Sequence, residues 1–168
     1  MRGRPNGFTI VGLLAVLLVL SLVAATTVRI YFSKSEVTLE NAAVLLARDV
    51  RAAQHRSIFL GEKSLMTFLT DGSGYVVTDT LGVVAHNPQT EESFRRIYPE
   101  DGVFLGVRVL EVRAGTDRTF EIDGRGVPLE DLEVTLGYRD DRRTVVVTAK
   151  SGAITIDGSS SGWIDSEG

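Results

Sequence analysis

The chain has 168 residues, a formal net charge of −4 and no cysteine. This length accommodates one domain of ordinary size with an accessory segment. The absence of cysteine excludes disulfides, thiolate metal sites, cysteine nucleophiles and lipidated cysteines. The acidic balance disfavours a nucleic-acid partner, because phosphate binding depends on clustered lysine and arginine.

An uncharged apolar run extends from Gly7 to Val28, with Arg4 before it and Arg29 after it. About 20 helical residues, at about 1.5 Å each, cross a hydrocarbon core of about 30 Å. The run therefore predicts a transmembrane and assembly helix over residues 8–30. The short basic leader before it places the N-terminus in the cytoplasm and the following residues outside. We expect a single-pass inner-membrane protein with a periplasmic C-terminal domain.

Two plainer interpretations compete with this one. An ordinary secretory signal has an apolar region of about 7 to 15 residues and a small-x-small cleavage site after it. The run here is longer, and Thr26 after Ala24 and Ala25 offers only a weak site. The other alternative is a plain anchor, which could also tether an enzyme. No nucleophile and base stand in a recognisable arrangement, so neither an enzyme nor a cofactor is expected.

Residues 1–7 read MRGRPNG and are followed directly by Phe8, Thr9 and Ile10. This segment resembles the leader of type IV prepilins. The resemblance implies that a prepilin peptidase cuts between Gly7 and Phe8 and that the new N-terminal Phe8 is N-methylated. It also implies that the apolar helix survives the cut and packs with the helices of other pilins or pseudopilins in a filament.

The sequence departs from the prepilin pattern at the fifth position after the expected cut. That family usually has Glu there, and its carboxylate is thought to pair with the N-terminal ammonium of a neighbouring subunit. Here the position is Gly12, which carries no carboxylate. A subunit at the filament tip has no subunit above it to pair with. The departure therefore favours a minor subunit, at or near the tip, over a repeatedly added one.

A helical pattern continues beyond the apolar run. Leu39, Ala43, Leu46, Val50 and Ala53 recur at steps of four and three, which predicts an amphipathic stalk helix over residues 31–62. The glycine at 61 is a plausible C-cap. The helix from residue 8 to residue 60 is either continuous or broken near residues 33–35.

From Ser64 onward the apolar period changes to two, which predicts a β-rich domain over residues 63–157 and a flexible tail over 158–168. Gly72 and Gly74 in the turn DGSG suit positive φ. The segment 82–101 predicts an irregular loop with one helical turn around 91–96. The fold class is α+β, a long helix packed on an antiparallel sheet. Strands are predicted at 64–70, 75–79, 103–112, 118–122, 132–138, 144–149 and 153–156.

Three stretches of this domain resemble the GspH/FimT family of pseudopilins. They are the helix and first hairpin at 43–79, TFEIDGRGVPLEDLEVTL at 119–136 and RRTVVVTAKSGAITI at 142–156. The resemblance implies a minor pseudopilin, a structural subunit of a type II secretion pseudopilus or a type IV pilus. Its alternative is a FimT-like minor pilin that binds DNA for uptake, with Arg95, Arg96 and Lys150 as the candidate contacts.

The remaining polar features predict no chemistry. His55 and His86 are the only histidines, and neither has ligand spacing to an acidic cluster, so we expect solvent-facing side chains and no metal. The segment RDDRR at 139–143 is nearly neutral and predicts a solvated turn. Trp163 in the tail either covers a core edge or contacts a neighbour.

Overall fold

The computed structural model describes residues 10–88 and 90–157. The chain divides into two compact units, residues 1–34 and 35–168, which are described separately. One helix, α1 (Ile10–Leu60), contributes to both. It ends where the C-cap was predicted, because Gly61 adopts a φ of +67° and its amide donates to the carbonyl of Ser57 at 2.9 Å.

The second unit contains two four-stranded sheets in which every strand pairing is antiparallel. The first sheet has the order β3-β2-β1-β5 and the second has the order β4-β6-β7-β8. The first comprises β1 (Ser64–Phe68), β2 (Gly74–Thr78), β3 (Arg95–Ile97) and β5 (Thr119–Ile122). The second comprises β4 (Arg108–Arg113), β6 (Leu132–Tyr138), β7 (Asp141–Val147) and β8 (Ile154–Asp157). Two single-turn 3₁₀ helices, η1 (Tyr98–Glu100) and η2 (Thr116–Arg118), connect strands.

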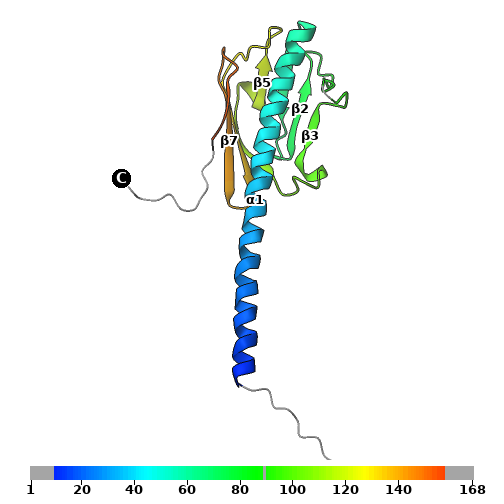
Figure 1. Cartoon of the computed structure of the whole chain (residues 1–168). Helices are drawn as coiled ribbons and strands as arrows, with labels where there is room; N and C mark the ends of the chain where they lie inside the picture. The colour runs from blue at the N-terminus through cyan, green and yellow to red at the C-terminus, as the bar shows by residue number, and fades with distance from the viewer. Residues whose placement is uncertain (1–9, 89, 158–168) are drawn as a thin grey trace, which may run out of the picture. The chain divides into compact units, whose positions relative to one another are not determined.

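Residues 35–60 of α1 share one hydrophobic core with both sheets. Leu39, Leu46 and Val50 are fully buried in the same cluster as Phe68 of β1 and Val145 of β7. Figure 1 shows this part of α1 lying across the sheets, with β2 and β3 on one side and β7 on the other. The predicted α+β class and the predicted buried stripe are both confirmed. The helix covers two sheets where the sequence suggested one.

A short strand occupies the segment that was predicted to be an irregular loop. Residues 95–97 form β3, which pairs with β2 through Gly74 and Ile97, so the predicted helical turn at 91–96 is wrong. A Cβ atom at Gly74 would collide with the carbonyl oxygen of Arg96. This glycine is therefore required by the close approach of β3, whereas Gly72 adopts the predicted positive φ, at +72°.

Two further predictions are corrected. The strand predicted from residue 103 begins at Arg108, because the amide of Val107 donates to the carbonyl of Phe104 in a turn. The segment 139–143 was predicted to be a solvated turn, and residues 139–140 do form a turn, but Arg143 lies on β7 and its side chain is only 10% exposed. Its guanidinium Nε donates to the carboxylate of Glu40 on α1 at 3.0 Å, so this arginine connects β7 to the helix.

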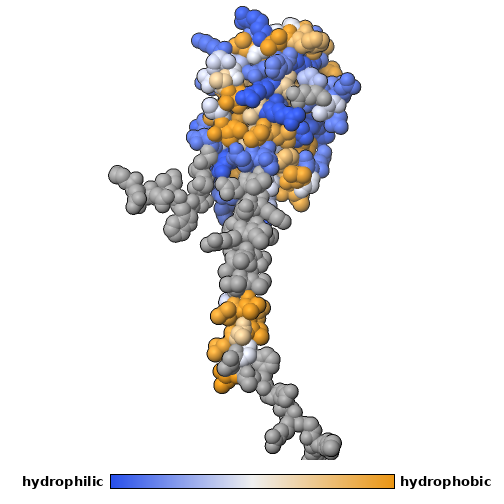
Figure 2. All heavy atoms as spheres, viewed as in Figure 1, coloured by the Kyte–Doolittle hydropathy of each residue, from blue (hydrophilic) through white to orange (hydrophobic). Residues whose placement is uncertain are grey.

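The two units differ in surface character. The described side chains between residues 10 and 20 of the first unit are mostly apolar and exposed. The visible face of the second unit intermixes hydrophilic and hydrophobic residues (Figure 2). Mixed surfaces of the second kind are usual for a domain in water.

Candidate interaction sites

The predicted processing site and the predicted assembly position lie in the first unit. Gly7 and Phe8 lie outside the described residues, so cleavage and N-methylation there stay predictions. Gly12 lies in the first turns of α1 and is partly exposed. Within the described residues, no helix combines the length and hydropathy needed to cross a membrane. Among the described side chains of this unit, the exposed large apolar ones are Ile10, Leu13, Leu14, Val16, Leu17, Leu18, Val19 and Leu20.

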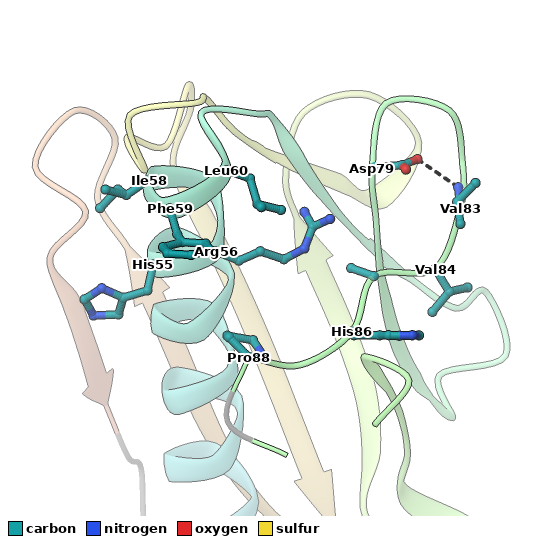
Figure 3. Close-up of a pocket in the computed structure, with 11 residues that line it drawn as sticks. His55, Arg56, Ile58, Phe59, Leu60, Asp79, Val83, Val84, His86 and Pro88 are labelled. Atoms are coloured by element: carbon teal, nitrogen blue, oxygen red, sulfur yellow. Dashed lines mark hydrogen bonds between the residues drawn. The ribbon is translucent and has the colours of Figure 1, made fainter. Parts of the chain in front are cut away.

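The second unit has a largely apolar groove between the end of α1 and the loop that follows β2 (Figure 3). Its volume is about 800 Å³. It is lined by His55, Arg56, Ile58, Phe59, Leu60, Asp79, Val83, Val84, Ala85, His86 and Pro88. No residue of this groove was predicted to belong to a site.

The helical wall of the groove arises from the last turn of α1. Ile58, Phe59 and Leu60 are consecutive, so they cannot all face the core on a helix of 3.6 residues per turn. Phe59 is 88% exposed. Because Gly61 ends the helix immediately afterwards, this apolar turn stays at the edge of the domain.

The opposite wall is a preformed loop. The Oδ1 atom of Asp79 accepts hydrogen bonds from the amides of Leu81 and Val83, each at 2.9 Å. The amide of Asp79 donates in turn to the carbonyl of Val83 at 3.0 Å, and Gly82 adopts a φ of +79°. These bonds fix the loop and hold Val83 and Val84 toward solvent.

Two histidines from distant segments of the sequence line the groove from different elements. His55 is on α1 and His86 is on the loop, and both line the groove. Arg56 extends from α1 toward the loop (Figure 3), and its Nη1 donates to the hydroxyl of Ser64 at 3.1 Å. Within the described residues, no group of three or more potential ligands could hold a metal ion. The mostly apolar lining suits contact with an apolar surface.

A buried polar cluster joins α1 to the first sheet. The carboxylate of Asp49 accepts a 2.7 Å hydrogen bond from the phenol of Tyr75, and the guanidinium of Arg96 lies 3.5 Å from it. Asp49 is only 4% exposed, and this burial raises its pKa above the usual 3.8, although Tyr75 and Arg96 both act in the opposite direction. The phenol of Tyr98 in the same region is also buried, which raises its pKa.

The arginines considered for DNA contact have acidic partners in the structure. Arg96 pairs with Asp49, and Nη2 of Arg95 lies 3.8 Å from the carboxylate of Glu100. Lys150 is exposed in the turn between β7 and β8. The carboxylates beside Arg95 and Arg96 reduce the positive potential that a phosphate backbone requires.

Comparisons with known proteins found similar chains only among solved structures. No protein-family model matches the chain, and no curated protein matches its sequence. Crystal structures of the type IV minor pilin FimU of Pseudomonas aeruginosa PAO1 are similar at 14% and 13% identity, each with a TM-score of 0.48. Each match covers 71% of this chain, and the two matches cover 87% and 92% of the respective FimU chains. The minor pseudopilin EpsH of the Vibrio cholerae Type 2 Secretion System is similar at 8% identity and a TM-score of 0.48, over 71% of this chain and 96% of EpsH.

Proposed function

We propose that this chain is a minor pseudopilin of the GspH/FimT type. It is a structural subunit of a type II secretion pseudopilus or a type IV pilus, and it has no catalytic role of its own. The observation that carries this proposal is the leader MRGRPNG directly before Phe8 and an uncharged apolar run. The same chain also has a long helix packed on antiparallel sheets, which is the fold class expected for such a subunit.

In this proposal a prepilin peptidase cuts between Gly7 and Phe8 and N-methylates Phe8. The cut removes the leader arginines and keeps the apolar segment. Residues 8–30 then hold the protein in the inner membrane, with the N-terminus in the cytoplasm and the second unit in the periplasm. The uncharged sequence supports this insertion, since even one central charge costs about 3 kcal/mol on the insertion scale.

Assembly follows from the same apolar segment. Its exposed leucines and valines offer a surface on which the helices of other pilins or pseudopilins can pack. The second unit has its own buried core, from Leu39 on α1 to Val147 on β7, so it can be carried as a folded body.

We further propose that the subunit sits at or near the filament tip, because Gly12 supplies no carboxylate for the contact that a subunit in the filament body makes. A subunit at the tip has no neighbour above it, so the missing carboxylate costs it no contact.

Recovery of the chain in sheared filaments tests the proposed function. The native chain should be recovered with the filament fraction of a strain that expresses the matching machine, and Gly7→Ala should remain uncut in the membrane. Asn6→Ala, which changes the adjacent leader residue, is the matched control and should assemble as the native chain does. If Gly7→Ala entered filaments as well as the native chain, processing at this site would not govern assembly, and the proposal would fail.

A further inference from the structure

The loop wall of the groove contains a short extended segment, residues 83–87. Val84 and His86 each form an isolated antiparallel bridge, Val84 with β2 and His86 with the residues before β3. Between them, the amide of Ala85 donates to a carbonyl of β2 at 2.9 Å, and its carbonyl accepts from the amide of Phe94 at 2.7 Å. This segment is therefore held against the first sheet along one of its edges.

The other edge of the segment has backbone groups without protein partners. Its four peptide units each use one group inside the domain, namely the carbonyl of Val83, the amide and the carbonyl of Ala85, and the amide of Asn87. In a trans peptide the N–H and the C=O point in opposite directions. The N–H and C=O groups of Val84 and His86 therefore lie on the outer edge, where they make no hydrogen bond to any other described residue.

A free edge with this spacing can accept an added β-strand. Val84 and His86 are two residues apart, so their donors and acceptors repeat at the interval that a paired strand requires. Edge strands usually avoid such pairing through charged side chains, bulges or proline. Here Val84 is 39% exposed, and Pro88 follows only after the two free residues. The edge is therefore chemically competent to pair.

The groove beside this edge adds an apolar surface and a cation. Phe59 and Ile58 of α1 are 88% and 56% exposed. The half-buried Arg56 extends from α1 toward the loop (Figure 3), and its only hydrogen bond within the described residues goes to the hydroxyl of Ser64. Asp79 lines the same groove, but its Oδ1 accepts from two loop amides and it forms no ion pair with Arg56. The guanidinium is therefore free to bind a carboxylate, and its partly apolar surroundings strengthen that attraction.

We propose that the groove binds an extended segment of another protein, which adds as a strand to the edge formed by Val84 and His86. A carboxylate of that segment pairs with Arg56, and an apolar side chain of the segment covers Phe59. The main-chain hydrogen bonds hold a strand of any sequence, so the carboxylate and the apolar side chain supply the selectivity. The groove volume of about 800 Å³ is within the range of ligand sites. This inference goes beyond the proposed function and does not depend on it.

Binding of dye-labelled peptides to the full chain tests the proposal. The chain is held in lipid nanodiscs, so that no detergent competes for the groove. The seven-residue peptides alternate Val and Thr, and each carries one Glu at a different position. Fluorescence anisotropy should show the tightest binding for the peptides whose Glu reaches Arg56. Replacing that Glu with Gln should weaken binding about tenfold, because the charge-assisted hydrogen bond is lost. Hydrogen exchange at the amides of Val84 and His86 should slow when the peptide binds.

Two further comparisons separate the ion pair from the strand pairing. Arg56→Gln should abolish the difference between the Glu and Gln peptides. Arg51→Gln, the same change at an exposed position of α1 outside the groove, should preserve it. Circular dichroism shows whether each variant is folded. N-methylation of alternate peptide amides removes the edge-facing donors in one of the two registers, and it should weaken binding at least tenfold in that register only. This comparison uses the native chain, so it decides the matter even if a variant does not fold.

Three results would overturn the proposal. The first is no measurable binding of any peptide at about 1 mM. The second is equal binding of the Glu and Gln peptides to the native chain, which would mean that Arg56 does not select a carboxylate. The third is binding that neither N-methylated register weakens and that leaves exchange at Val84 and His86 unchanged, which would assign the groove to a ligand that does not pair as a strand.

Discussion

The phenol of Tyr75 on β2 donates a 2.7 Å hydrogen bond to the carboxylate of Asp49 on α1, inside the core of the second unit. Arg96 on β3 approaches the same carboxylate, so this one acid connects the helix to two strands. A buried carboxylate needs such partners, because an unpaired charge in the core is strongly destabilising.

Replacing Asp49 should show how much this contact contributes. Asp49→Ala leaves the phenol and the guanidinium without their acceptor and should lower the free energy of unfolding by about 3 kcal/mol. Asp49→Asn keeps an oxygen that can accept from Tyr75 and should cost about 1 kcal/mol. Urea unfolding of residues 35–168 measures both. Equal losses for the two variants would mean that the acceptor oxygen does not matter.

The raised pKa of Asp49 predicts a pH dependence with a definite sign. The folded state binds the proton more tightly than the unfolded state, so ionising Asp49 opposes folding. The stability that the protonated group contributes is therefore lost as the pH rises from about 3.8 through the raised pKa, and it stays lost above it. Relative to Asp49→Asn, the native sequence should lose stability across this window. A difference between the two that is constant with pH would contradict the burial effect.

The second unit should fold by itself. Residues 35–168 should form a β-rich monomer, because the buried core lies within them. Leu46 is fully buried, and Leu46→Asp should cost several kcal/mol by placing an unpaired charge between α1 and the sheets. Val44→Asp introduces the same side chain at an exposed position of the same helix and should change stability by less than about 1 kcal/mol. Thermal midpoints that are equal for the two variants would refute a shared core.

Gly12→Glu tests the proposed position at the filament tip. The new carboxylate costs about 3 kcal/mol in an apolar span unless it is paired. At the tip the substitution should bring no gain in recovery from sheared filaments, and accumulation should fall. In the filament body it could pair with a neighbouring ammonium, and recovery should rise. Quantifying the subunit for both forms at equal expression distinguishes the two positions, and a clear rise would contradict the tip.

Features of the fold set by nearby residues could be read from the sequence. The end of α1 was predictable because Gly61 follows the last apolar turn, and the first hairpin was predictable because its turn and both strands are contiguous. The buried stripe of α1 was predictable because its spacing alone identifies the face. These signals act over a few residues, where local preferences and periodicity suffice.

Contacts between distant residues could not be predicted in the same way. Arg143 is buried because it meets Glu40, 103 residues earlier in the chain. Residues 95–97 have no strand signal of their own and pair with β2 because Gly74 admits their backbone. Likewise, His55 and His86 line one groove only because the fold places the end of α1 next to the loop after β2. In each case the partner is fixed by the packing of α1 and the sheets.

The intact mass of the chain isolated from membranes that contain prepilin peptidase tests the central claim most directly. The proposal predicts a polypeptide that begins at Phe8 and carries one N-methyl group. A chain that still begins at Met1, or one that begins near Thr26 after removal of the apolar run, would contradict the assignment as a pseudopilin.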